Sequence, residues 1–303
     1  MGINNIPAKT CTYSCVYCQV GRTTEMRTDR RAFYDPEAVF RDVKDRLAEA
    51  KKASERVDYL AFVPDGEPTL DANLGREISL LKALGTPVAV ITNGSLLWLE
   101  DVRKDLALAD WVSVKVDAVR EEVWRKIDRP HKSLMLTRVL DGIRAFAKDF
   151  AGRLVTETML VRGINDVAGE LEDLAEFLGS IEPDTAYLSI PTRPPAEAGV
   201  RVPDEGSLNL AFQILSRRAA RVELLIGYEG DAFAATGAVE GDLLGITAVH
   251  PMREDAVRAF LARAGSPWET VERLVGRGDL VRTDYNGRSF YIRRFAKGTE
   301  PAP

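Results

Sequence analysis

The chain has 303 residues, of which 45% are hydrophobic and 29% charged, and its net charge is −5. This composition is typical of a soluble globular protein, and the longest apolar runs are strand-sized. It therefore excludes a signal peptide and a membrane span and favours a cytoplasmic protein. The negative charge provides no overall attraction for a polyanion, so any nucleic-acid contact must come from a local basic patch.

All three cysteines lie near the N-terminus, at Cys11, Cys15 and Cys18. An odd number argues against a disulfide framework. Thiolates are the usual ligands of iron–sulfur clusters, and three of them can hold three irons of a [4Fe–4S] cluster while the fourth iron has no protein ligand. Two alternatives remain open. A structural zinc site needs a fourth ligand, but His131 and His250 lie far along the chain, and a redox CxxC motif leaves Cys11 unused.

The segment after the cysteines predicts a regular alternation of helices and strands. Asp35-Pro36-Glu37 is typical of a helix start, with Asp35 as N-cap, and this helix is expected to end near Ala53. The alternation implies parallel βα units with ligand-binding groups at the C-terminal ends of the strands. Residues 1–7 are few for a first strand, so either this strand is short or the protein starts upstream. Strands are expected at 57–63, 87–94, 111–117, 154–161, 186–190 and 221–226, and helices at 71–84, 97–107, 121–127, 133–150, 166–181 and 207–219.

The cysteine spacing CxxxCxxC, with the aromatic Tyr17 before the last cysteine, resembles the radical S-adenosylmethionine (SAM) superfamily. The resemblance implies an α/β fold, a partial (β/α)6 barrel of parallel strands, over residues 1–230. It also implies two cofactors, a [4Fe–4S] cluster and SAM, whose amino and carboxylate groups bind the open iron. The reduced cluster breaks the S–C5′ bond of SAM, and the resulting 5′-deoxyadenosyl radical abstracts hydrogen from a substrate.

The same resemblance assigns SAM contacts to two turns. Gly66-Glu67 matches the GE motif, whose glutamate binds the methionine ammonium through a charge-assisted hydrogen bond, and Gly66 allows a close approach of the backbone. The alternative is a turn with exposed acids. Asn93 matches the TNG turn and is expected to bind the SAM carboxylate or ribose, although Asn-Gly is also a common turn dipeptide.

Three further candidates lie on later strands or just after them. The cation of Lys115 would suit the SAM carboxylate, and the alternative is a salt bridge inside the barrel with Glu67 or Asp117. Thr158 and Arg162 lie where the superfamily contacts the adenine and ribose of SAM. These two are implied by the resemblance alone.

The periodicity changes after the expected barrel. Residues 231–248 are rich in Gly, Ala and acidic residues and are expected to form a linker, and 249–297 a small winged helix-turn-helix-like domain. This domain is expected to contain two helices, the second opened by the capping box Ser266–Glu269, and a hairpin around Asn286-Gly287. Its basic and aromatic side chains could contact nucleic acid. Interleaved acidic residues dilute this patch, so a lid or partner-docking module is slightly favoured. The tail 298–303 is expected to be disordered.

Residues 2–11 and the turns at 65–69 and 192–195 look like the group related to wyosine-type tRNA base synthases. Those synthases are implied to use additional cysteines for a second cluster, and this chain has none. The sequence therefore predicts an enzyme that cleaves SAM with electrons from a ferredoxin or flavodoxin and takes hydrogen from an RNA base, a peptide or a metabolite. The alternative is a redox-sensing DNA-binding regulator that carries an iron–sulfur cluster.

Overall fold

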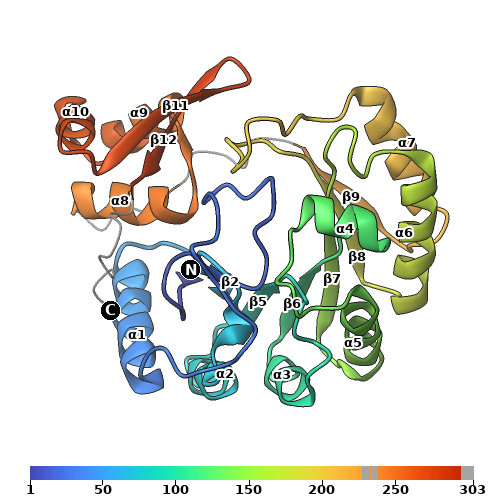
Figure 1. The fold of residues 1–303 in the computed structure, drawn as a ribbon. Coiled ribbons are helices and arrows are strands. Elements are labelled where there is room, and N and C mark those ends of the chain that lie inside the picture. The colour runs from blue at the N-terminus through green and yellow to red at the C-terminus, as the bar shows by residue number, and fades with distance from the viewer. Residues whose placement is uncertain (227–232, 234–237, 295–303) are drawn as a thin grey trace.

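The main body of the protein is a parallel sheet with helices on its outer face (Figure 1). The computed structural model describes residues 1–226, 233 and 238–294. Over these residues the seven-stranded sheet has the order β1-β4-β5-β6-β7-β8-β9, so successive strands pair with one another in chain order. This is the geometry of repeated βα units wound in one direction. The predicted α/β fold, a partial barrel of parallel strands, is confirmed.

The strands are β1 (Gly2–Ile3), β4 (Leu60–Phe62), β5 (Val88–Thr92), β6 (Trp111–Lys115), β7 (Arg153–Met159), β8 (Thr185–Ser189) and β9 (Val222–Leu225). The helices of the barrel are α1 (Pro36–Lys52), α2 (Leu74–Lys82), α3 (Glu100–Leu106), α4 (Glu121–Ile127), α5 (Leu136–Asp149), α6 (Ala168–Ile181) and α7 (Glu205–Leu215). A short parallel pair, β2 (Thr10–Cys11) and β3 (Glu25–Met26), and the 3-10 turn η1 (Pro68–Leu70) lie at the site. The expected alternation is thus observed, with strands shorter than the apolar runs that predicted them.

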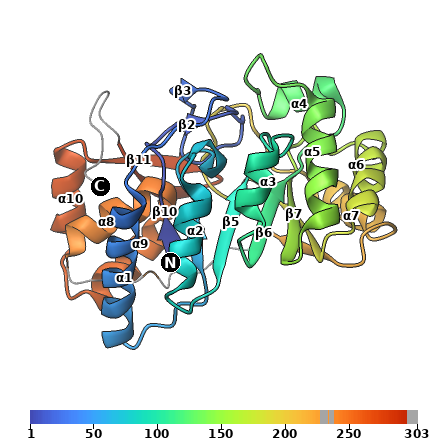
Figure 2. The same ribbon diagram turned by 90° about the horizontal axis from the view of Figure 1, so that it is seen from below.

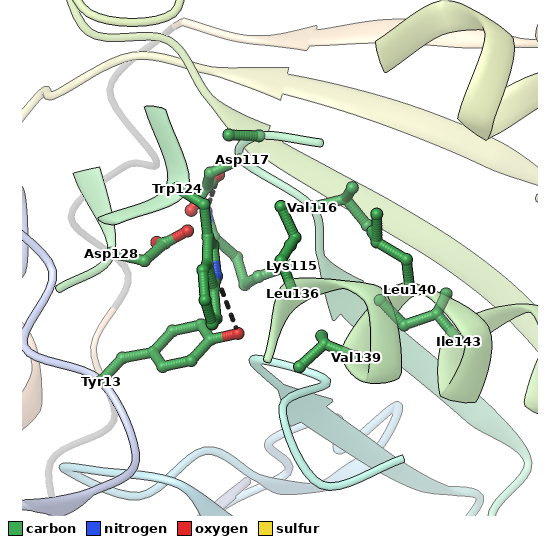
Figure 3. Close-up of a pocket in the computed structure, with 11 residues that line it drawn as sticks. Tyr13, Lys115, Val116, Asp117, Trp124, Asp128, Leu136, Val139, Leu140 and Ile143 are labelled. Carbon is green, nitrogen blue, oxygen red and sulfur yellow. Dashed lines mark hydrogen bonds and ion pairs between the residues drawn. The ribbon is translucent and has the colours of Figure 1, made fainter. Parts of the chain in front are cut away.

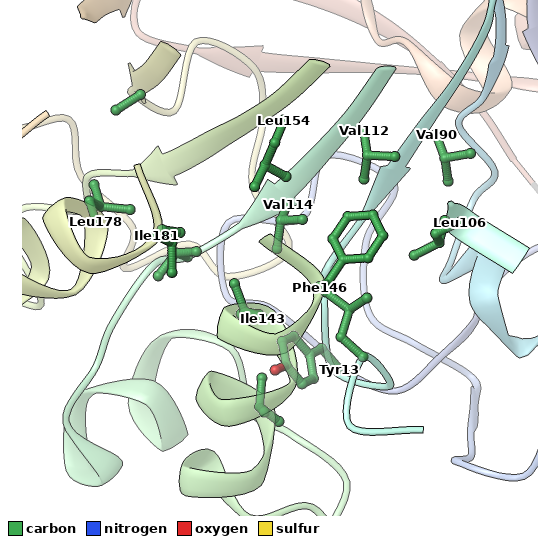
Figure 4. Close-up of a cluster of buried hydrophobic side chains, with 14 of the residues drawn as sticks. Tyr13, Val90, Leu106, Val112, Val114, Ile143, Phe146, Leu154, Leu178 and Ile181 are labelled. Carbon is green, nitrogen blue, oxygen red and sulfur yellow. The ribbon is translucent and has the colours of Figure 1, made fainter. Parts of the chain in front are cut away.

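The core lies between the strands and the outer helices. Val90, Val112 and Leu154 on the strands face Ile143 and Phe146 of α5, as Figure 4 shows, and all five are buried. Because both faces of a parallel sheet are covered, its strands read as continuous apolar runs. Each such side chain contributes about 1.5–3 kcal/mol when fully buried. This packing fixes the strand ends, from which the polar turns project.

The cap predicted for the first long helix is present. The carboxylate of Asp35 accepts a hydrogen bond of 3.2 Å from the backbone N–H of Glu37, and Pro36 is the first residue of α1. Strand β1 contains two residues and pairs in parallel with β4. The short first strand expected within residues 1–7 is therefore confirmed.

A C-terminal unit follows the barrel and has a core of its own, which includes Leu243, Phe260 and Leu274. Its three-stranded antiparallel sheet has the order β10-β12-β11. Its elements are α8 (Val239–Val249), β10 (Met252–Arg253), α9 (Glu254–Arg263), α10 (Glu269–Gly276), β11 (Leu280–Tyr285) and β12 (Arg288–Arg293).

Two predictions for this unit need correction. Residues 239–248, expected in the linker 231–248, belong to α8, because Leu243 anchors this Gly-containing segment in the core. The capping box is not formed: the Ser266 hydroxyl lies 3.0 Å from the Thr270 hydroxyl, and Trp268 precedes α10 without a side-chain cap. Of the remaining linker residues, the structure describes only Phe233 and Ala238. The tail 298–303 lies outside the described residues.

The helices of the C-terminal unit lie on the α1 side of the barrel, away from α6 and α7 (Figure 2). Its hairpin reaches the loop after β8, where the Tyr285 hydroxyl donates a 3.1 Å hydrogen bond to the carbonyl of Pro191. Nearby, Arg193 Nη2 lies 2.7 Å from His250 Nε2. The unit is thus attached to the rim of the barrel at the C-terminal ends of the strands. No helix in the described ranges is long and apolar enough to cross a membrane.

Candidate active site

The three cysteines share one loop above the sheet. Cys11 ends β2, and its sulfur lies 3.5 Å from the backbone N–H of Tyr13. The loop folds back on itself, because Thr23 donates to the carbonyl of Tyr13 over 2.6 Å and Cys18 N–H donates to the carbonyl of Cys15 over 3.1 Å. These contacts gather the thiols on one short segment, as the spacing predicted.

Burial raises the pKa of all three thiols, that of Cys11 to about 12. Backbone N–H groups oppose this at Cys11 and Cys18, and Lys9 also lowers the pKa of Cys18. The Cys15 thiol donates to Asp128 Oδ1 over 3.4 Å. A cluster binds thiolates, and N–H donors and a lysine suit thiolates. The donor set, three thiols with N–H donors and a lysine beside them, therefore fits a [4Fe–4S] cluster.

Glu67 lies beside the cysteine loop, 1% exposed. Its Oε1 accepts hydrogen bonds from the Thr69 N–H at 3.1 Å and from the hydroxyls of Thr69 and Thr92, both at 2.6 Å. Its Oε2 accepts from the Asn93 N–H at 2.8 Å. Burial raises the pKa of Glu67, and these donors oppose the rise by stabilising the carboxylate. Glu67 is therefore not the exposed turn residue of the alternative interpretation.

The turn with Gly66 touches the cysteine loop directly. A Cβ atom at Gly66 would lie 1.8 Å from the carbonyl oxygen of Thr10, which also accepts a 3.1 Å hydrogen bond from the Glu67 N–H. On the other side Asn93 Nδ2 donates to the Thr12 hydroxyl over 2.7 Å and lies 3.6 Å from Cys11 Sγ. The structure thus brings Gly66, Glu67 and Asn93 together at Cys11.

Lys115 lies in a cluster of charges at the ends of β6 and β7. Its Nζ is 3.5 Å from Asp117 Oδ1, 3.3 Å from Glu157 Oε1 and 5.0 Å from the centre of the Tyr17 ring. Burial would lower the pKa of Lys115, but Asp117 and Glu157 together outweigh it and raise that pKa. The Tyr17 hydroxyl hydrogen-bonds Asp117. Lys115 therefore forms a salt bridge with Asp117. This salt bridge is the alternative, expected from the sequence, to a contact with the SAM carboxylate.

A pocket opens beside this cluster and is polar at one end. The carboxyl groups of Asp117 and Asp128 lie at that end, and Leu136, Val139 and Ile143 line the apolar end (Figure 3). Burial and then the neighbouring Asp117 raise the pKa of Asp128 well above its usual range. The pocket lies between the end of β6 and helix α5, and Asp128 at its polar end also contacts Cys15.

The two candidates for adenine and ribose contacts lie in different surroundings. The hydroxyl of Thr158 is buried and donates a 2.7 Å hydrogen bond to the carbonyl of Val116. Arg162 is exposed and lies 3.8 Å from Asp204 at the surface. The hydroxyl of Thr158 is therefore already hydrogen-bonded to the backbone, and Arg162 is not brought to the cysteines.

Sequence reasoning missed Asp128 and Ser189. Asp128 is the residue after α4, and Ser189 donates a 2.8 Å hydrogen bond to Glu157 from the end of β8. Ser189 carried a weak signal, because it is a polar residue at the end of a buried strand. Asp128 carried none, since it lies in a loop between two helices.

The comparisons with known proteins agree with this geometry. The sequence model of the Radical SAM superfamily matches residues 5–178. The chain belongs to the radical SAM superfamily. It is 42% identical over 295 residues to the UPF0026 protein MJ1312 of Methanocaldococcus jannaschii, with 97% of this chain and 91% of that protein covered. Membership of the radical SAM superfamily implies a [4Fe–4S] cluster and SAM as cofactors.

Two more distant radical SAM proteins are similar over part of the chain. The S-adenosyl-L-methionine-dependent tRNA 4-demethylwyosine synthase TYW1 of Mus musculus is 28% identical over 193 residues, which cover 59% of this chain and 26% of that protein. The crystal structure of a radical SAM methyltransferase from Sphaerobacter thermophilus aligns with a TM-score of 0.56 at 17% identity, over 78% of this chain and 69% of that one. The second likeness concerns the fold alone.

Proposed function

We propose that this protein is an enzyme that binds SAM beside a [4Fe–4S] cluster on Cys11, Cys15 and Cys18 and uses it to abstract hydrogen from a substrate at the barrel mouth. The observation that carries this proposal is the convergence of Glu67 and Asn93 on Cys11. When bound, the reduced cluster supplies the electron that cleaves SAM. The side chains of the protein bind SAM and orient it.

Glu67 holds the methionine ammonium in this proposal. Its hydrogen-bond donors favour the charged carboxylate, which forms a stronger, charge-assisted bond to an ammonium. Asn93 orients the SAM carboxylate or ribose from the end of the next strand. Among the residues that the structure describes, Lys115 is the only positive charge in its cluster, and Tyr17 lies beside it. The proposed site omits Arg162, because its guanidinium is exposed.

The substrate classes remain an RNA base, a peptide or a metabolite. Similarity to the mouse tRNA-modifying enzyme supports an RNA base first, although the match covers 26% of that protein. This chain has three cysteines in all, so a second cluster held by cysteines is not part of the proposal. A ferredoxin or flavodoxin is the proposed electron donor.

The C-terminal unit has the element order helix, strand, helix, helix and hairpin, which supports our proposal that it is a winged helix. We propose that it caps the substrate entrance, because Tyr285 contacts the rim of the barrel. Several of its arginines pair with its own acids: Arg273 and Arg277 pair with Glu240, and Arg258 pairs with Glu254. This neutralisation counts against the alternative, a DNA-binding regulator, which should bind duplex DNA with a steep salt dependence.

The decisive experiment measures SAM cleavage without a substrate. Anoxically reconstituted protein, reduced with dithionite, is expected to form 5′-deoxyadenosine and to change its cluster spectrum when SAM is added. Cys15→Ala should abolish both signals. Ser14→Ala, which alters the neighbouring residue on the same loop, should retain them. No product above the Cys15→Ala background, together with no spectral response to SAM, would overturn the proposal.

A further inference from the structure

Three buried side chains behind the Glu67 turn carry oxygens without a hydrogen-bond partner among the described residues. Asn5 follows β1, Asp71 follows η1, and Glu77 lies on α2; each is 0% exposed. The oxygens are Asn5 Oδ1, Asp71 Oδ2 and both carboxylate oxygens of Glu77. Buried polar groups in proteins are nearly always partnered, so four orphaned oxygens in one region need a physical explanation.

These three side chains are neighbours. Burial and then the Asp71 carboxylate raise the pKa of Glu77 to about 8, and burial raises that of Asp71 to about 6. The amide of Asn5 lies close enough to lower the pKa of both carboxyl groups. Its Nδ2 donates to the carbonyl of Pro68 over 3.3 Å, and Asp71 Oδ1 accepts from the Asn73 N–H over 2.8 Å. The remaining oxygens have no hydrogen-bond partner at ordinary distance among the described residues, and the amide of Asn5 is the donor that the two carboxyl groups share.

The nearest positive charge is directed elsewhere. Arg30 lowers the pKa of Asp71, but its Nε donates to the carbonyl of Thr69 over 2.9 Å and its Nη2 to the Asp71 carbonyl over 2.8 Å. The guanidinium also pairs with Asp101 and Asp105. Two buried carboxyl groups thus have no dedicated counter-charge in this region, and buried carboxylates without one take up a proton or bind a metal ion.

We propose that Asn5, Asp71 and Glu77 form a binding site for a hard divalent cation. The donor set consists of oxygen alone, which hard cations prefer, and the two carboxylates match a charge of +2. Ca²⁺ is the expected occupant, since it accepts irregular sets of protein oxygens and bidentate carboxylates, whereas Mg²⁺ demands near-octahedral geometry. The ion would join the end of β1, the turn after η1 and helix α2. It would thereby hold the turn that carries Glu67.

The test uses cluster-free full-length protein, so its outcome does not depend on SAM cleavage. After treatment with a chelator, the thermal midpoint of the wild type is expected to rise by about 5 °C with millimolar Ca²⁺. It should rise less with Mg²⁺ and not at all with Na⁺ at the same ionic strength. Equilibrium dialysis should give one bound Ca²⁺ per chain. Glu77→Gln should abolish the response and the binding, and exposed Glu122→Gln should retain both.

A shared proton is the competing explanation and makes the opposite prediction. The pKa of Glu77 is raised above its unfolded value, so the folded state binds the extra proton. Stability would then be full below about pH 4.5 and would fall as the pH rises to about 8, with no response to any cation. That result overturns the proposal. If Glu77→Gln does not fold, Asp71→Asn provides the same comparison, and an unchanged Ca²⁺ response in either variant also overturns it.

Discussion

Glu67 and Glu77 are two buried glutamates on opposite sides of one turn, and their surroundings are opposite. Glu67 is 1% exposed and Glu77 0%. Glu67 accepts hydrogen bonds from Thr69, Thr92 and Asn93, whereas neither oxygen of Glu77 has a partner within the described part of the chain. Burial raises the pKa of both, but donors oppose the rise more strongly at Glu67.

The difference teaches that burial alone does not define what a carboxyl group can do. A carboxylate held by donors can remain charged and bind a cationic group of a ligand, as proposed for Glu67 and SAM. A carboxyl group without donors needs a proton or a metal ion, as proposed for Glu77. Glu157 is an intermediate case: burial would raise its pKa, but Lys115 and then Ser189 outweigh burial and lower it.

The largest expected effect comes from removing the cation of Lys115, which would leave Glu157, like Glu77, without a counter-charge. Lys115→Met leaves the buried Asp117 and the partly buried Glu157 without their cation, and the free energy of unfolding should fall by about 3–5 kcal/mol in urea titrations of cluster-free protein. The exposed pair Lys104–Glu100 provides the control, because Lys104→Met should cost about 0.5 kcal/mol or less. Equal losses in the two variants would show that the Lys115 cluster does not depend on its cation.

The turn between the two glutamates is expected to be nearly as sensitive. Gly66→Ala places a Cβ 1.8 Å from the Thr10 carbonyl oxygen, so one of the two loops must move. Unfolding should become easier by about 3 kcal/mol, and the iron content after reconstitution should fall. Gly276→Ala is the matched control, because its Cβ meets nothing within 4 Å. Normal iron loading in Gly66→Ala would contradict the close contact between the loops.

The two glutamates can be compared directly by the same substitution. Glu67→Gln removes the charge proposed to bind the SAM ammonium, and SAM affinity should fall by about 10- to 100-fold, measured by titration of the reconstituted protein. Glu77→Gln should change SAM affinity much less, because Glu77 lies behind the turn. Equal losses would remove the distinction between a ligand-binding and a structural carboxyl group.

The smallest expected effect is a shift in pH dependence. Thr92→Val removes one donor to Glu67, whose pKa should therefore rise further. SAM binding requires the carboxylate, so it is present above the pKa of Glu67 and is lost as the pH falls through it. In Thr92→Val this loss should begin at a higher pH, with only a few-fold change at pH 8. An unshifted acid limb in the binding titration would argue that Glu67 does not contact the ammonium.

The sequence predicted best what depends on neighbouring residues. The cap at Asp35, the strands and the turn at Gly66-Glu67 follow from local patterns, and parallel strands place their polar ends on one edge. Asn93, at the end of β5, lies near Cys11, and its contact with SAM stays a prediction.

What depends on distant residues could not be predicted. Asp128 reaches Cys15 across more than a hundred positions, and the pairing of Asn5 with Glu77 joins a loop to a helix. The sequence periodicity of α2 shows only that Glu77 is a polar residue on a helix. It does not show which residues cover the helix face that carries Glu77. Helix α8 was not predicted, because its glycines lower the helix propensity of the segment. The packing of Leu243 in the core overrides this low propensity.

The close contact between the cysteine loop and the Glu67 turn has a thermodynamic consequence. The Lys9 N–H donates to the Asp65 carbonyl over 2.8 Å and the Glu67 N–H to the Thr10 carbonyl over 3.1 Å, so neither loop can be ordered without the other. Linkage then requires reciprocity: if assembly of the cluster tightens the hold on SAM, SAM must protect the cluster from iron loss by the same factor. The equilibrium affinity for iron, measured by competition with a chelator with and without SAM, would report that factor without a single turnover.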